Sequence, residues 1–260
     1  MIRYCKIKKK IIGFDRPKIC VPLVGGSDDE ILGKADAICM AAERDTIDMV
    51  EFRGDYYEAL NDENKLKNLM NKLQDKFSDM IFLFTIRSEQ EGGEKLNFDT
   101  PSINEINSFV IKNELADMVD VELMSGVEAV SEQVELAKEH GVKIIMSNHD
   151  FNTTPDADVI VNRLRSMQDL GADIAKIAVM PECKMHVLNL LAATAMMSDK
   201  YAEVPIVTIS MGKLGAISRI CGEAFGSAIT FSVLDKASAP GQIPVHDLNE
   251  IMDGIGKYCV

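Results

Sequence analysis

Short apolar runs alternate along the chain with longer stretches in which apolar residues recur at helical spacing. The runs predict eight strands, each followed by a helix: Lys18–Val24, Thr46–Arg53, Met80–Thr85, Met118–Glu122, Lys143–Asn148, Ile174–Val179, Pro205–Ser210 and Ala228–Phe231. The residues before the first run could form a short hairpin. Strands that alternate with helices in this way predict βαβ units and a parallel sheet.

The fifth helix has the clearest predicted limits. Thr154 is expected to cap it, Pro155 suits its first position, and Asp156 suits the positive end of the helix dipole. Apolar residues then recur at helical spacing from Ile160 to Leu170, and Gly171 is expected to end the helix.

Eight βα units in 260 residues fit an α/β fold of the (β/α)₈ TIM-barrel type, with one catalytic domain over residues 1–260. The alternative is an open, doubly wound sheet, which usually carries a glycine-rich phosphate-binding turn after its first strand. The Val24–Ser27 segment is too short for that pattern and predicts only a turn. Because the chain contains no linker or short-period repeat, a single domain is favoured.

Composition narrows the range of partners and compartments. The formal net charge of −13 argues against a nucleic-acid partner, because phosphate binding needs a basic face. No run approaches the ~18 apolar residues of a membrane span, and the basic N-terminal stretch is not followed by the apolar segment of a secretory signal. The six cysteines are scattered, without zinc spacing, which favours reduced thiols in a cytoplasmic protein that needs no metal.

Polar side chains gather where the predicted strands end, which is where a (β/α)₈ barrel places its chemistry. The candidates, in chain order, are Glu51, Arg53, Arg87, Glu91, Glu122, His149, Arg219, Ser238 and Gln242. The three arginines could be ordinary surface charges. Their shared position at one barrel mouth favours binding of an oxygen-rich anion, which arginine holds through forked hydrogen bonds.

Lys176 lies inside a strand rather than at its end. The two-residue period places it on the same face as Ile174 and Ala178, and both faces of a parallel sheet are covered, so we expect it to be buried. Burial disfavours the ammonium form, and a neutral amine attacks carbonyl groups. The residues alone allow a second interpretation, a structural ion pair with Glu51 or Glu122.

His149 could be a general acid and base, because histidine titrates near neutral pH, or a core residue held by one hydrogen bond. Its neighbour Asp150 should point the opposite way on an extended chain, so a carboxylate from another loop is the better partner. Glu91 is the candidate. The alternative for Glu91 is a solvated charge in the acidic run that spans Glu89 and Glu94.

Five segments carry a family resemblance: Asp48–Asp55, Phe84–Gly93, Met146–Phe151 with Thr154–Pro155, Gly171–Pro181, and Ser218–Arg219 with Ala237–Gln242. In this order they resemble the type I 3-dehydroquinate dehydratases, the Schiff-base class of this shikimate-pathway enzyme. The resemblance implies a (β/α)₈ barrel, usually a homodimer, that needs no metal or organic cofactor.

The resemblance also implies a role for each candidate residue. Lys176 matches the imine-forming lysine, His149 the proton-transfer histidine, and Glu91 the glutamate that supports this histidine. Arg219 matches the arginine that binds the substrate carboxylate. Glu51, Arg53 and Arg87 match the residues that contact the ring hydroxyls. Gln242 matches the loop glutamine, and Ser238 matches the lid-loop serine. Pro22 stands where some members have a serine, so no hydroxyl contact is expected there.

The implied reaction is loss of water from 3-dehydroquinate to give 3-dehydroshikimate. One alternative is a class I aldolase or transaldolase acting on sugar phosphates, although the loop around Pro240 makes a poor phosphate nest because proline lacks an N–H. A second alternative is a non-catalytic barrel that binds a small acid and regulates a partner. Such a protein would not need a nucleophilic lysine beside a histidine and a glutamate.

Overall fold

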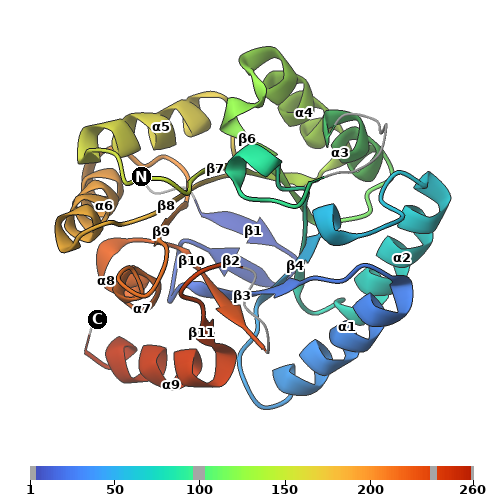
Figure 1. Ribbon diagram of the computed structural model, residues 1–260, viewed down its shortest axis with the longest axis horizontal. Helices are drawn as coiled ribbons and strands as arrows, with labels where there is room; N and C mark the ends of the chain where they lie inside the picture. Colours follow the sequence, from blue (N-terminus) through green and yellow to red (C-terminus); the bar gives the residue numbers. More distant parts are fainter. Residues whose placement is uncertain (1–3, 96–102, 235–238, 259–260) are drawn as a thin grey trace.

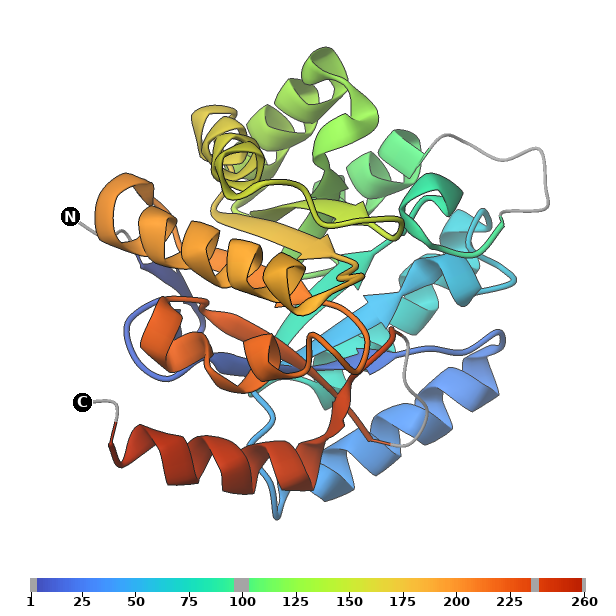
Figure 2. The same cartoon turned by 60° about the vertical axis from the view of Figure 1, so that its left-hand side comes forward.

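The computed structural model describes residues 4–95, 103–234 and 239–258, and in these ranges eight parallel strands curl into a barrel covered outside by helices (Figures 1 and 2). The strands are β3 (Lys18–Leu23), β4 (Met49–Arg53), β5 (Ile81–Thr85), β6 (Met118–Glu122), β7 (Lys143–Asp150), β8 (Ile174–Val179), β9 (Ile206–Ser210) and β10 (Ile229–Val233). A short strand, β11 (Ile243–Pro244), pairs with β10. The predicted (β/α)₈ class is therefore confirmed.

The barrel closes between β9 and β10 through a single bridge rather than a full ladder. Ile206 bridges to Ser227, and the Ala228 N–H donates to the Ile206 carbonyl at 2.8 Å. The Ser227 hydroxyl also accepts the N–H of Thr208 at 3.1 Å. These contacts join the last two strands just where β10 begins.

The helices on the outside of the barrel are α1 (Asp28–Ala42), α2 (Glu63–Lys76), α3 (Ile103–Lys112), α4 (Val127–His140), α5 (Ala157–Asp169), α6 (Lys184–Met196), α7 (Ile217–Ile220), α8 (Gly222–Phe225) and α9 (Val245–Gly256). Every helix within the described ranges is too short or too polar to cross a membrane.

The predicted start of α5 is wrong. The helix begins at Ala157 with Asp156 at the N-cap, not at Pro155 with Thr154 as cap. The Thr154 hydroxyl instead donates to the Met180 carbonyl at 2.9 Å, beyond the end of β8. The connection after β7 is thus tied to the neighbouring strand, and the helix starts only after it.

Alternation along the strands divides the apolar residues into two layers. Side chains on one face fill the barrel interior, including Met49, Leu83, Met118, Ile145, Ile174 and Phe231. Those on the other face, such as Phe52, Phe82 and Phe84, pack between the sheet and the helices. This two-residue period decides which polar side chains enter the barrel.

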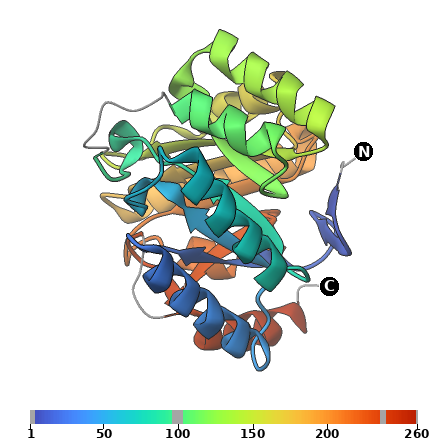
Figure 3. The same ribbon diagram turned by 90° about the vertical axis from the view of Figure 1, so that its right-hand side faces the viewer.

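An N-terminal hairpin closes the end of the barrel at which the strands begin (Figure 3). Its strands are β1 (Cys5–Ile7) and β2 (Lys10–Ile12), and their apolar side chains join the interior cluster. Lys8 pairs with Asp117 and Lys10 with Asp48, each at 2.8 Å. The predicted hairpin is confirmed, and it covers the barrel interior at the end where the strands begin.

Three aspartates immediately before β4, β6 and β8 stabilise the same end of the barrel. Asp48, Asp117 and Asp173 each accept the N–H of a residue in the preceding strand, at 3.0, 2.7 and 2.9 Å. Each also pairs with a lysine: Lys10, Lys8 and Lys143, respectively. The fixed charges at this end therefore bind strands to one another, whereas those at the opposite end surround a cavity.

Candidate active site

A small cavity opens at the end of the barrel where the strands finish. Eight of the nine residues to which the family resemblance gives a role line this cavity: Glu51, Arg53, Arg87, Glu91, His149, Lys176, Arg219 and Gln242. The ninth, Ser238, lies outside the described residues. Apolar side chains such as Ile209 and Phe231 complete the lining. Residues far apart in the sequence thus meet in one place.

Lys176 lies in the barrel interior and is 3% exposed. Its Nζ is 3.3 Å from Asp120 Oδ2 and 3.9 Å from Glu51 Oε1, and it lies 4.5 Å from the centre of the Phe231 ring. The expected burial is confirmed. Of the two ion-pair partners considered from the sequence, Glu51 is within reach, whereas Glu122 was the wrong choice because it pairs with Arg87.

Arg87 holds this group of carboxylates together. Its guanidinium donates to Asp120 at 2.7 Å, and to Glu122 and the Ser147 hydroxyl at 2.9 Å each. Burial opposes the charge on Arg87, but Asp120 and Glu122 outweigh burial and raise the pKa of Arg87. Burial likewise disfavours the Asp120 carboxylate, yet Arg87 and Lys176 hold the pKa of Asp120 below its ordinary value.

Two of the three arginines at the mouth are thus engaged by protein carboxylates. Arg87 serves Asp120 and Glu122, and Arg53 makes a forked pair with Asp55 at 2.8 and 2.6 Å. The idea that all three are available for an anion is therefore too simple. A fork already filled by a carboxylate orients its neighbours more readily than it binds a ligand.

Arg219 differs from the other two. It is 3% exposed and donates to the carbonyls of Phe231 and Pro240 at 3.2 and 3.0 Å. Among the described residues, its Nε has no hydrogen-bond partner and no carboxylate pairs with it. Burial lowers the pKa of Arg219 to about 10. A buried cation without a counter-ion is costly, which makes this position suited to a bound anion.

Glu91 lies beside the His149 ring. The Nδ1 atom of His149 is 2.9 Å from Glu91 Oε2, and the same oxygen accepts the His149 backbone N–H at 2.8 Å. A short turn, η2 (Glu89–Glu91), places the carboxylate, since the Ser88 hydroxyl caps it and Gly92 ends it at φ 83°. Asp150 points elsewhere and accepts the N–H groups of the loop after β7.

The charges around this pair set its protonation. Burial, followed by the charge of Glu122, raises the pKa of Glu91 from 4.5 to about 7. Burial, followed by Arg87 and Lys176, lowers the pKa of His149 well below 6.5. The imidazole is therefore neutral at neutral pH. When Glu91 is ionised, it accepts the proton on Nδ1, which leaves the lone pair on Nε2 able to act as a base.

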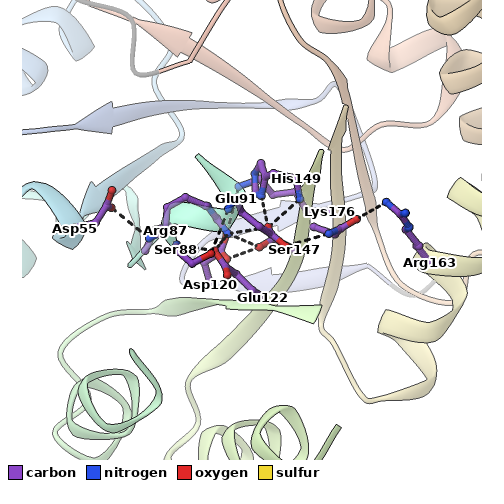
Figure 4. A network of polar contacts seen from close by, with 12 residues as sticks. Asp55, Arg87, Ser88, Glu91, Asp120, Glu122, Ser147, His149, Arg163 and Lys176 are labelled. Carbon is purple, nitrogen blue, oxygen red and sulfur yellow. Dashed lines mark hydrogen bonds and ion pairs between the residues drawn. The ribbon is translucent and has the colours of Figure 1, made fainter. Parts of the chain in front are cut away.

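Several polar residues of this network were missed from the sequence, among them Asp120, Asn148 and Arg163; Figure 4 shows Asp120 and Arg163 within it. Asp120 could have been predicted from the strand period, because it lies two residues before Glu122 on β6 and therefore shares its face, which points to the interior. Asn148 and Arg163 had no such signal. Asn148 donates to Glu91 Oε1 at 3.0 Å, and Arg163 on α5 donates to Asn148 Oδ1 at 2.9 Å.

Comparison with known proteins agrees with this geometry. Residues 19–258 match the family model of type I 3-dehydroquinase. The 3-dehydroquinate dehydratase of Bacillus licheniformis is 45% identical over 252 residues, which are 97% of each chain. A crystal structure of type I 3-dehydroquinate dehydratase from Clostridium difficile, with covalently modified comenic acid, superposes with a TM-score of 0.93 at 43% identity and covers 99% of each chain.

A 3-dehydroquinate dehydratase structure from Geobacillus kaustophilus also has a TM-score of 0.93, at 35% identity, and covers 98% of this chain and 97% of that one. The fold, the lysine in the barrel and nearly full-length similarity all agree. The chain belongs to the type I 3-dehydroquinase family.

Proposed function

We propose that this site removes water from 3-dehydroquinate to give 3-dehydroshikimate, with Lys176 as the covalent nucleophile. Family membership supports the reaction. The observation that carries the residue assignment is a buried lysine in the same cavity as a histidine–glutamate pair and an arginine that has no carboxylate partner among the described residues. The comenic acid in the C. difficile relative is covalently modified, which is consistent with covalent chemistry at this site.

Imine formation solves the central chemical difficulty. The Nζ atom of Lys176 attacks the ketone carbon, and loss of water from the carbinolamine leaves a protonated imine. This group withdraws electrons more strongly than the ketone and so acidifies the adjacent carbon. The positive charge remains at Nζ, where Asp120 is 3.3 Å away and Glu51 is 3.9 Å away. These carboxylates would stabilise the cation as it forms.

His149 would then move protons. Nε2 takes the proton from the carbon adjacent to the imine, which yields an enamine. The enamine pushes out the β-hydroxyl group, and His149 returns a proton so that it leaves as water. Hydrolysis of the remaining imine restores the Lys176 amine and releases the enone product. Glu91 keeps Nδ1 protonated, so that Nε2 faces the substrate with its lone pair.

The remaining residues would hold the substrate. Arg219 supplies the cation for its carboxylate, because this guanidinium alone among those lining the cavity lacks a carboxylate partner in the described chain. Glu51, Arg53 and Arg87 are proposed to contact the ring hydroxyls, and Gln242 is proposed to act with Arg219 at the carboxylate. Ser238 is proposed to close over the substrate. Fixing the ring at both ends sets the reacting carbon beside Lys176 and His149.

Borohydride trapping tests the assignment directly. Reduction in the presence of 3-dehydroquinate should leave a stable mass adduct on the peptide that contains Lys176. The Lys176→Ala variant should neither turn over nor form the adduct, whereas Lys184→Ala, which removes an exposed lysine on α6, should do both. Turnover by the wild-type protein without an adduct on Lys176 would refute the imine.

Substrate trials separate this function from the two alternatives. Cleavage of sugar phosphates without dehydration of 3-dehydroquinate would favour an aldolase. Binding of 3-dehydroquinate without turnover would favour a non-catalytic acid-binding barrel. Formation of an enone, followed by its absorbance, supports the dehydratase.

We also propose that the protein is a single-domain chain that forms a homodimer in the cytoplasm. Family membership supports this organisation. Met185 and Leu188 on the outer side of α6 are large apolar side chains that are 60% and 54% exposed, as expected for a surface that a second copy covers. Sedimentation equilibrium would show a dimer, and a strictly monomeric protein would contradict the proposal.

A further inference from the structure

The His149–Glu91 pair is connected to helix α5 by two polar side chains that the proposed mechanism does not use. Glu91 Oε2 accepts from the backbone N–H and Nδ1 of His149, and Glu91 Oε1 accepts from Asn148 Nδ2 at 3.0 Å. Asn148 Oδ1 accepts in turn from Arg163 at 2.9 Å. Figure 4 shows Arg163 reaching from α5 towards this network. An unbroken series of hydrogen bonds thus runs from a surface helix to the histidine.

Arg163 determines which way round the Asn148 amide lies. A carboxamide has a donor end and an acceptor end, and a simple flip exchanges them. A guanidinium has donors only, so it selects the orientation in which Oδ1 faces α5 and Nδ2 faces Glu91. Asn148 is 4% exposed, so water cannot readily replace either contact. Without Arg163, the amide oxygen could turn towards the carboxylate and repel it.

The charged groups around Glu91 explain why the hydrogen bond from Asn148 affects the ionisation of Glu91. Arg87 is 3.5 Å from Glu91 and favours the carboxylate, whereas Glu122 and Asp120 on β6 oppose it. Lys176 and Arg53, the other cations that face His149, complete the charged groups around the pair. Burial raises the pKa of Glu91 to about 7, and the hydrogen bond from Asn148 lowers it. Close to neutral pH, one donor more or fewer therefore changes how much of Glu91 is ionised.

We propose that Asn148 and Arg163 form a positioning relay in which Arg163 orients the Asn148 amide and Asn148 keeps Glu91 ionised and aligned with His149. The relay rests on the proposed function, since its effect is to keep Nε2 of His149 ready to accept a proton. Neither Asn148 nor Arg163 is among the described residues that line the cavity. Both act through Glu91 and not on the substrate.

Kinetics over a range of pH test the relay. If Arg163→Met raised the pKa of Glu91 by about one unit, the ionised fraction at pH 7 would fall from about half to about one-tenth, and kcat would fall roughly fivefold. The acid limb of the kcat profile should move to higher pH, while KM changes by less than about twofold because the substrate contacts are intact. Asn148→Leu breaks the series at the next link and should have the same or a larger effect.

Two further variants serve as controls. Arg163→Lys keeps a cationic donor and should recover part of kcat and of the pH profile. Arg165→Met removes an exposed arginine from the same helix, where its guanidinium lies over the Tyr201 ring, and should leave both unchanged. Wild-type kcat and pH dependence in both Arg163→Met and Asn148→Leu would overturn the relay. A change confined to KM, or a loss explained entirely by a smaller folded fraction, would also overturn it.

Nitrogen NMR of the imidazole rings tests the relay without turnover. The chain has four histidines, so His149→Gln identifies the His149 signals. In the wild-type protein above about pH 8, we expect the tautomer with the proton on Nδ1. Arg163→Met and Asn148→Leu should mix the two tautomers or shift their pH midpoint, and unchanged signals would refute the relay. A wild-type protein that fails to dehydrate 3-dehydroquinate would refute the proposed function alone.

Discussion

Replacing Glu91 with glutamine removes a carboxyl whose pKa rises on folding from 4.5 to about 7, mainly through burial and secondly through the charge of Glu122. Such a group binds its proton more tightly in the folded state than in the unfolded state. Its contribution to stability is therefore fully present below about pH 4.5 and is lost as the pH rises through about 7. Glutamine does not titrate, so Glu91→Gln should gain stability relative to the wild-type protein as the pH rises.

The size of the change follows from the two pKa values. The linkage relation gives a difference of about 2.5 kcal/mol in the free energy of unfolding between about pH 5 and pH 8. Glutamine also weakens the contacts to His149 and Asn148, but that cost is the same at each pH. Burial lowers the pKa of His149 in the folded state of both proteins, so the pH dependence that His149 contributes cancels from the difference between them.

Guanidinium chloride unfolding at about pH 5, 6, 7 and 8 measures the effect. Circular dichroism is the suitable probe, because the chain has no Trp. Glu89→Gln, which removes an exposed carboxyl from the same turn, is the matched control and should show a much smaller trend. If the difference between Glu91→Gln and the wild-type protein stayed constant within about 0.5 kcal/mol, the reasoning about the Glu91 pKa would be refuted.

Three other substitutions test other parts of the structure. His149→Ala should accumulate a covalent intermediate on Lys176, visible in the intact mass, and near-normal turnover would show that another group carries the proton. Arg219→Lys keeps the positive charge but loses the forked pair of N–H donors. It should raise KM roughly tenfold to a hundredfold in steady-state kinetics, in keeping with the loss of a charge-assisted hydrogen bond. An unchanged KM would contradict the anion site. Asp48→Ala leaves the Ile19 N–H and Lys10 without their acceptor, and should lower the free energy of unfolding by about 1–3 kcal/mol with kcat unchanged; an equally stable variant would contradict the role of this aspartate.

Periodicity was sufficient to predict most of the fold. Two strands, β6 and β8, have the predicted limits, and the others differ by one to three residues at an end. The strand β11 was missed because two residues paired beside β10 have no period to detect. The start of α5 was misplaced because Thr154 has a tertiary partner, the Met180 carbonyl, that no local pattern reveals.

The site was predictable where chemistry and strand period coincide. Lys176 is recognisable because a lysine in a buried strand needs a reason, and Asp120 could have been found from the same period. The pairing of Arg53 and Arg87 with carboxylates could not be predicted, because it depends on contacts between strands. Arg163 is fifteen residues from Asn148, on a helix, and only the folded arrangement brings them together.

The ends of the described chain lie at the same end of the barrel as the N-terminal hairpin, and this position determines where the protein can be fused or tethered. Both ends of the described chain, near Tyr4 and Tyr258, lie on the side where the strands begin, away from the cavity (Figure 3). A domain or a tag fused at either end would therefore leave the entrance to the cavity open. An immobilised enzyme tethered through the C-terminus should keep access to its substrate, whereas attachment through the loops after the strands would obstruct it.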